Sequence, residues 1–148
     1  EITARQHQHR CEVLLLEETQ ASAQQAMALD VKEGTAIFHS LMLHFENDVP
    51  VQIEDRCVNA LRVPAYLEQD YTATTPHAYL SLIAPLTEGE HIVEAVRATR
   101  QECELLRIKE HDPCLMIRRR TWSASNIVSH ARLLFPGDRY RLQGHFMS

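Results

Sequence analysis

The fold is decided by one stretch, residues 38–59, which reads FHSLMLHFENDVPVQIEDRCVN. Residues 36–45 and 49–58 are rich in apolar and β-branched side chains, and the three polar residues 46–48 separate them. Two such runs joined by a short polar turn predict a β-hairpin. Apolar and polar residues alternate along the second run, so we expect that strand to have one apolar face and one polar face.

Glu54 and Arg56 project from the polar face of the second strand, and the length of the hairpin loop decides which residues of the first strand join them. A loop of three residues brings the even-numbered residues to this face, namely Ser40, Met42 and His44. A loop of two residues, Asn47-Asp48, brings the odd-numbered ones instead, namely His39 and Leu41. The two alternatives differ completely because a one-residue slip in register turns every side chain to the other face.

The remaining elements are predicted from composition, periodicity and turn residues. Further strands are expected at residues 10–18, 114–122, 127–135 and 140–146. Helices or helical turns are expected at residues 21–29, 64–67, 77–83 and 102–108. Residues 88–98 fit either a helix or a strand. The whole chain, residues 1–148, therefore reads as one α+β domain, a mainly antiparallel β-sheet with helices packed against one side.

Composition excludes several classes of function. The formal net charge of −5 argues against nucleic-acid binding by this segment, which would need a basic face. No apolar run approaches the roughly 20 residues that cross a bilayer. The four cysteines lack metal-ligand spacing and lie in apolar segments, so we expect a reduced, cytoplasmic protein. The chain begins with Glu1 rather than Met, and we expect it to be a fragment of a longer protein.

Motifs that carry catalysis or hold a cofactor are absent from the sequence. No serine lies in a nucleophile elbow, and the four glycines form no phosphate-binding loop. His7, His9 and Cys11 would share one face of a strand and resemble part of a metal site, but no fourth ligand accompanies them. We therefore expect no metal, no cofactor and no enzyme activity.

The polar face of the hairpin admits two interpretations. It can be a solvent-facing sheet surface, which is the usual arrangement. Alternatively it can look into a cavity, where Glu54 would accept an N–H group of a ligand while Arg56 binds a carboxylate through its planar fork. Glu94 also needs a partner, because it lies among apolar neighbours.

Five segments together resemble the UTRA effector-binding domain of GntR-type repressors, in particular the HutC subfamily. They occur in the family's order and span nearly the whole chain: residues 38–59, 75–79 (TPHAY), 88–96 (EGEHIVEAV), 114–122 (CLMIRRRTW) and 131–140 (ARLLFPGDRY).

The resemblance implies a chorismate-lyase-like fold and a homodimer that binds a small-molecule effector. It also implies a preceding winged helix-turn-helix domain, absent from this chain, that binds operator DNA. The implied role is control of histidine utilisation in the cytoplasm, without contact with a membrane. The implied effector is urocanate, the first intermediate of histidine breakdown, or a related imidazole acid. Two alternatives remain, a small lyase of the related fold and a dimerisation module without a ligand site.

The resemblance also suggests which residues bind the effector. Met42 and His44 stand where relatives that bind phosphosugars have arginines, which favours an effector without phosphate. Arg56, or Arg120 if it points inward, is expected to bind a carboxylate, with Arg119→Ala as the control. The complete set of expected effector-binding residues is Met42, His44, Glu54, Arg56, His77, Tyr79, Glu94, Arg120, Ser129 and Phe135.

Overall fold

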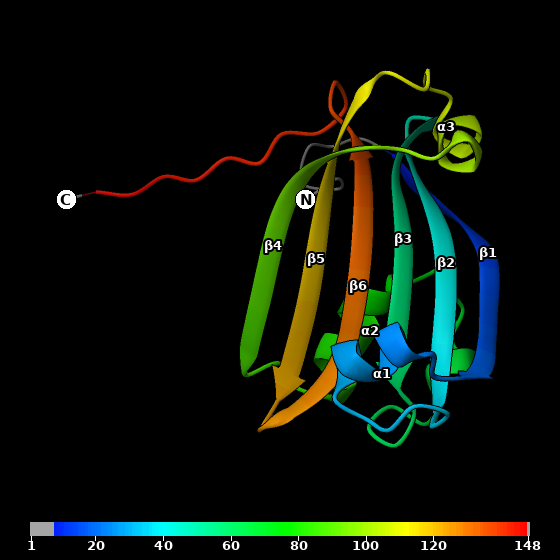
Figure 1. Ribbon diagram of the computed structural model, residues 1–148, viewed down its shortest axis with the longest axis vertical. Helices are drawn as coiled ribbons and strands as arrows, with labels where there is room; N and C mark the ends of the chain where they lie inside the picture. Colours follow the sequence, from blue (N-terminus) through cyan, green and yellow to red (C-terminus); the bar gives the residue numbers. More distant parts are fainter. Residues whose placement is uncertain (1–7, 148) are drawn as a thin grey trace.

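The computed structural model describes residues 8–147, which form one six-stranded sheet in the order β1-β2-β3-β6-β5-β4 (Figure 1). Every neighbouring pair of strands is antiparallel. The strands are β1 (His9–Gln20), β2 (Ala36–Glu46), β3 (Val49–Asn59), β4 (Glu88–Arg97), β5 (Pro113–Ser123) and β6 (Asn126–Pro136). The helices are α1 (Ala23–Leu29), the 3-10 turn η2 (Tyr66–Glu68), α2 (Pro76–Ile83) and α3 (Arg100–Leu106). The predicted α+β class with a mainly antiparallel sheet is confirmed, and residues 88–98 are a strand.

Helices cover both faces of the sheet, so the expectation of a single covered side was wrong. α1 and α3 lie in front of the sheet in Figure 1, and α2 lies behind it. The alternation along β2 explains this arrangement. Its odd-numbered residues Ile37 and Leu43 belong to the clusters that contain α1 and α3. Its even-numbered residues Phe38 and Met42 pack in the cluster that contains Leu80 of α2.

The β2–β3 hairpin combines features of the two alternatives that the sequence left open. Its turn is the two-residue one, and Asn47 and Asp48 both have positive φ angles, of 52° and 64°. However, His44 pairs with Gln52 while Phe45 pairs with Pro50, so Val51 is an extra residue that forms a β-bulge.

The bulge turns the side chains of β2 to the faces that a three-residue loop would have given them, although the pairing is two residues further along β3. Met42 lies opposite Glu54, and Ser40 lies opposite Arg56. The even-numbered residues of β2 therefore share the face of Glu54 and Arg56. The expected link between loop length and register was wrong because it did not allow for a bulge.

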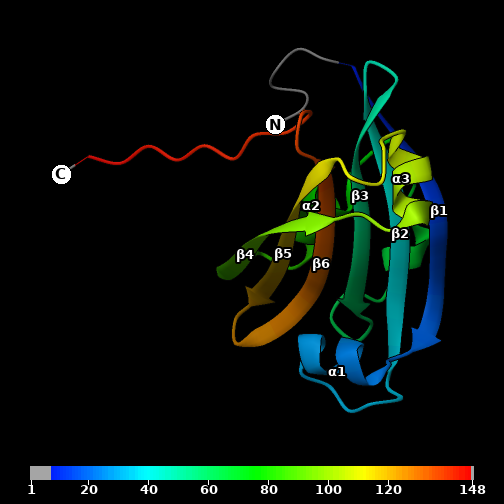
Figure 2. The same cartoon turned by 45° about the horizontal axis from the view of Figure 1, so that its top comes forward.

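The strand expected at residues 140–146 is also wrong. Residues 140–147 belong to no helix or strand and extend away from the sheet (Figures 1 and 2). β6 already has β3 and β5 as neighbours, so no sheet edge lies beside it for the following residues to join. We call residues 140–147 the C-terminal tail.

Two expectations about the protein's environment can be compared with the fold. Across residues 8–147, no helix has the length and apolar character needed to cross a membrane. The four cysteines, which all lie in this range, are buried and form no disulfide. Burial raises the pKa of Cys11 to about 12 and that of Cys57 to about 11, so both thiols stay protonated.

Candidate functional site

The polar face of β3 forms one wall of a cavity of about 700 Å³, a size typical of small-molecule sites. We call it the Glu54 cavity. Side chains of β2, β5 and β6 extend this wall, while Thr75 and His77 line the cavity from the start of α2. α2 begins there because the Thr75 side chain accepts a hydrogen bond from the N–H of Ala78, and Pro76 fits the first helical turn.

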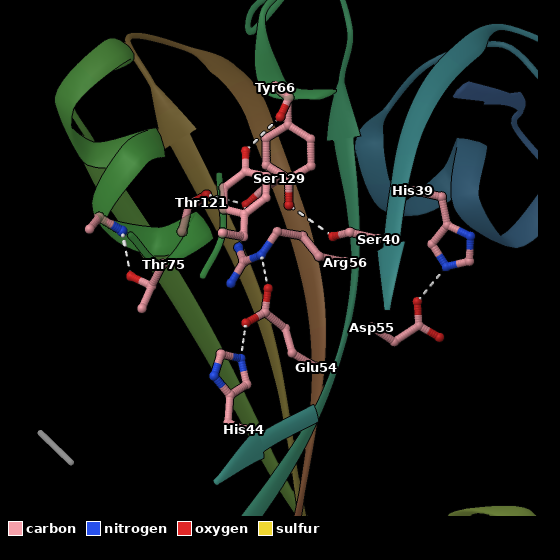
Figure 3. A network of polar contacts seen from close by, with 12 residues as sticks. His39, Ser40, His44, Glu54, Asp55, Arg56, Tyr66, Thr75, Thr121 and Ser129 are labelled. Atoms are coloured by element: carbon pink, nitrogen blue, oxygen red, sulfur yellow. Dashed lines mark hydrogen bonds and ion pairs between the residues drawn. The ribbon is translucent and has the colours of Figure 1, made fainter. Parts of the chain in front are cut away.

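A chain of hydrogen bonds runs through the buried wall of the Glu54 cavity (Figure 3). His44 Nε2 donates to Glu54 Oε1 at 2.9 Å, and Arg56 Nε donates to Glu54 Oε2 at 2.9 Å. A second N–H group of Arg56 donates to Ser129 Oγ at 3.1 Å, and Ser129 Oγ lies 2.9 Å from the hydroxyl of Thr121. Glu54 and Arg56 are only 4% and 2% exposed, so this polar face is shielded from bulk water.

Glu54 and Arg56 both carry charge in this buried setting. Burial alone would raise the pKa of Glu54, but the charge of Arg56 and the hydrogen bond from His44 outweigh it and hold that pKa at about 2. Burial would likewise lower the pKa of Arg56, and the carboxylate of Glu54 raises it instead. The cavity wall therefore presents an ionised carboxylate whose orientation is set by two donors.

The carboxylate of Glu54 orients the two histidines at the end of this series of hydrogen bonds. A carboxylate only accepts hydrogen bonds, so His44 must carry its proton on Nε2. His44 Nδ1 then faces His9 Nε2 at 2.9 Å, and the two rings are stacked with centroids 5.2 Å apart. Burial and the nearby His44 lower the pKa of His9, which favours a neutral His9.

A second cationic group faces the Glu54 cavity from β5. Arg119 lines the cavity, and its Nε donates to Nε2 of His91 on β4 at 2.8 Å. Because that nitrogen accepts a hydrogen bond, His91 is neutral and carries its proton on Nδ1. Arg119 and Arg56 are both paired with Ala131 of β6, one from each side, and Ala131 separates them with a single methyl group.

The structure brings five of the ten expected residues to the cavity. His44, Glu54, Arg56, His77 and Phe135 line it. Ser129 lies directly behind the wall, where it bonds to Arg56. Met42 and Tyr79 are instead packed in the core beneath α2.

Arg120 and Glu94 lie on the opposite face of the sheet, and the expectation that Arg120 points inward was wrong. Arg119 faces the cavity, so its neighbour Arg120 must point away from it. Arg120 binds Glu90 at 2.9 Å. Glu94 has the partner that its apolar neighbours required, because Arg118 Nε donates to it at 2.8 Å. We remove Arg120 and Glu94 from the candidate site.

Sequence reasoning missed several residues of the cavity, chiefly His91, Arg119, Thr121 and Tyr140. Arg119 had been chosen as the control residue, a choice that its position in the cavity rules out. The alternation of β5 offered a signal, since Thr121 and Arg119 must share a face. The signal is weak because residues 118–120 are all arginine, so their side chains do not indicate which of them lies on which face of the strand.

The described residues contain no group of three His, Cys, Asp or Glu side chains arranged to hold a metal ion. His7, one member of the suggested trio with His9 and Cys11, lies outside the described residues.

Comparison with known proteins identifies the family. The UTRA domain model matches residues 4–141. The chain is 78% identical over 148 residues to the histidine utilization repressor of Klebsiella aerogenes, covering all of this chain but 61% of that protein. The crystal structure of the C-terminal domain of the histidine utilization repressor from Pseudomonas syringae pv. tomato superposes with a TM-score of 0.92 at 57% identity, covering 95% of this chain and 100% of that one.

A more distant structure shares the fold alone. The effector domain of PhnF from Mycobacterium smegmatis superposes with a TM-score of 0.91 at 18% identity, covering 99% of this chain and 92% of that one. The match to the family model over nearly the whole chain, together with the near relatives, shows that the chain belongs to the UTRA domain family.

Proposed function

We propose that this chain is the effector-sensing domain of a bacterial transcriptional repressor of histidine utilisation, and that the Glu54 cavity binds urocanate or a related imidazole acid. The identity with histidine utilization repressors supports the regulatory role. The observation that carries the ligand assignment is the buried wall, where an ionised Glu54 lies beside histidines and two arginines face the same space. An imidazole acid needs both an acceptor for its ring N–H and a cation for its carboxylate.

The carboxylate is proposed to bind above Ala131, between Arg56 and Arg119. Neighbouring strands lie about 4.8 Å apart, so the backbones of these two arginines are separated by about 10 Å, and both side chains can reach a group between them. Arg56 already uses two N–H groups to hold Glu54 and Ser129. We therefore assign a mixed binding and positioning role to Arg56, and direct contact with the carboxylate to Arg119, which lines the same cavity.

The imidazole ring is proposed to lie over Leu133, with Phe135 as an apolar wall. Leu133 pairs with Glu54 across the sheet, which brings the ring N–H within reach of the carboxylate. An ionised carboxylate has about four acceptor positions, so Glu54 can accept a ligand N–H in addition to its bonds from His44 and Arg56. His77 and Thr121, which line the same space, complete the polar contacts.

The charge of this wall also disfavours a phosphorylated effector. Glu54 remains ionised, and His44, the residue beside it, is oriented by that carboxylate. A phosphate placed here would meet like charge in a poorly solvated setting, which is unfavourable. A monocarboxylate whose charge lies at the Arg119 end avoids this repulsion.

Regulation is proposed to involve parts of the protein beyond this chain, which spans 61% of the relative from Klebsiella aerogenes. In the cytoplasm the full-length repressor would bind operator DNA as a homodimer through a winged helix-turn-helix domain. Effector binding would favour the dimer arrangement with lower DNA affinity. Such coupling requires that the two arrangements bind urocanate with different affinities.

Isothermal titration calorimetry with three ligands tests the assignment. Urocanate should bind, whereas its methyl ester, which lacks the charge, and cinnamate, which replaces the imidazole by a phenyl ring, should each bind at least about tenfold more weakly. Equal affinity for cinnamate would contradict the role of Glu54. No heat and no thermal shift with urocanate would contradict the effector assignment and favour a dimerisation module.

A further inference from the structure

The C-terminal tail and the edge strand β4 are two exposed segments that complement each other. We propose that the tail of one copy of this chain pairs along β4 of a second copy, and that the exchange is reciprocal. The proposal rests on the homodimer of the proposed function and specifies how that dimer is built.

The tail leaves the body of the domain as an extended segment (Figures 1 and 2). It exposes large apolar side chains, with Leu142, Phe146 and Met147 at 53%, 92% and 85% exposure. A lone exposed apolar residue is ordinary, but three within six residues mark an interaction segment.

The tail also has the residue pattern of a strand with one apolar face. Tyr140, Leu142 and Phe146 occupy even positions, and the odd positions between them carry polar side chains, namely Arg141, Gln143 and His145. This period of two is that of a β-strand. The pattern explains why the segment resembles a strand although no strand lies beside it in the single chain.

β4 offers the surface that such a strand requires. It is an edge strand, paired with β5 alone among the described strands, and it is ten residues long. Ile92 and Val93 are 48% and 43% exposed. A long exposed edge with apolar side chains is a template for pairing with another strand.

The two faces of β4 match the two faces of the tail. Val93 lies on the face of the Glu54 cavity, the same side as Tyr140, where the apolar positions of the tail would continue. Glu90 and Glu94 lie on the other face, where Arg141 and His145 of the tail would extend their ion pairs with β5. Opposite charges on neighbouring strands stabilise the pairing in either strand direction.

The anchoring of the tail favours a second copy over the chain's own β4. Arg139 donates to the carbonyl oxygens of Pro50 and Arg107, and the Tyr140 ring is stacked on Phe135 with centroids 3.8 Å apart. A strand added at the free edge of the chain's own β4 would lie three strand spacings, about 14 Å, from β6. In both views the tail runs out on the β4 side of the sheet but continues past that edge, beyond the body of the domain.

This arrangement would connect the effector to the dimer. Phe135, Arg139 and Tyr140, which is the first residue of the tail, all line the Glu54 cavity. A ligand that shifts Tyr140 would change the direction in which the tail leaves and hence the angle between the two copies. Exchange of an identical element is a low-cost route to a dimer.

Crosslinking between two differently tagged chains tests the exchange. One chain carries Val93→Cys in β4, and the other carries Gly144→Cys in the tail, where an added side chain meets open space. With a short bis-maleimide, the mixture should give a product containing both tags, and the wild type, whose cysteines are buried, should give none. Absence of the mixed product contradicts the exchange. The exchange is also contradicted if the only product joins two Val93→Cys chains. A third contradicting result is a crosslink within a single chain that carries both substitutions, formed at high dilution.

Sedimentation measures association separately, without any ligand. We expect Leu142→Asp to weaken the dimer at least about tenfold and Gln143→Lys, which puts a charge of favourable sign on the face of Glu90 and Glu94, to change it much less. Circular dichroism checks that both variants fold. A monomeric wild type, or a dimer that Leu142→Asp leaves intact, overturns the exchange. Because neither experiment contains urocanate, the exchange and the effector assignment can fail independently.

Discussion

Arg56 of β3 and Arg119 of β5 are paired with the same residue, Ala131 of β6, from opposite sides, and both line the Glu54 cavity. Their backbone positions are equivalent, but their partners differ. Arg56 donates to the buried carboxylate of Glu54, whereas Arg119 donates through Nε to His91. Both cations face the same space, and the proposed carboxylate site lies between them.

Arg119→Met should weaken urocanate binding by about 10- to 100-fold, the range expected for loss of a charge-assisted hydrogen bond. Arg120→Met is the matched control, because its side chain lies on the opposite face and binds Glu90. Calorimetry of both variants makes the comparison. Equal losses for the two substitutions would show that Arg119 acts only through the overall charge of the domain.

Glu54→Leu should lower the free energy of unfolding by about 3–5 kcal/mol, because it leaves the buried charge of Arg56 without its partner. The double variant with Arg56→Met should recover part of this loss, since apolar residues can replace a buried ion pair. Urea denaturation measures both values. If the single and double variants are equally unstable, lost packing rather than an unpaired charge is responsible.

The stability that Glu54 provides should depend on pH. Its pKa is about 2 in the folded protein and 4.5 in its ordinary environment, so it is depressed by folding. A depressed carboxyl pKa stabilises the folded state above the unfolded value, and this contribution is lost as pH falls through 4.5 toward 2. The difference in unfolding free energy between wild type and Glu54→Gln should therefore shrink over this interval. A difference that stays constant with pH would mean that Glu54 is not ionised in the folded protein.

His39 should show the opposite dependence. Its hydrogen bond with Asp55, at 2.7 Å, raises its pKa above the ordinary 6.5. A raised pKa adds stability that is complete below 6.5 and is lost as pH rises through the folded value. His39→Gln should thus cost more stability in mild acid than in mild alkali. A larger cost in alkali, measured by thermal denaturation, would contradict the ion pair.

The sequence predicted the elements well where side-chain alternation was strong. The β2–β3 hairpin and the strands β5 and β6 follow from local pattern, because each has an apolar face to bury. Residues 88–98 fitted a helix as well as a strand, and the strand they form, β4, is largely exposed. The exposure of the tail could not be predicted, because Leu142 and Phe146 alternate as in a paired strand and only the topology shows that β6 has no open side.

The candidate site was predicted in part for a related reason. Glu54 and Arg56 were found because they lie on the polar face of an alternating strand. Arg119 was missed because residues 118–120 are all arginine and only the register with β6 distinguishes them. The bulge at Val51 also leaves no local signal, although it determines that His44 rather than His39 lies beside Glu54.

A crystal structure of this chain with saturating urocanate tests the central claim most directly. The ligand should occupy the Glu54 cavity, with its carboxylate within hydrogen-bond distance of Arg119 and its ring N–H directed at Glu54. Urocanate bound on the opposite face of the sheet, near Arg118 and Arg120, or bound in the cavity with its carboxylate turned toward Glu54, would contradict the assignment.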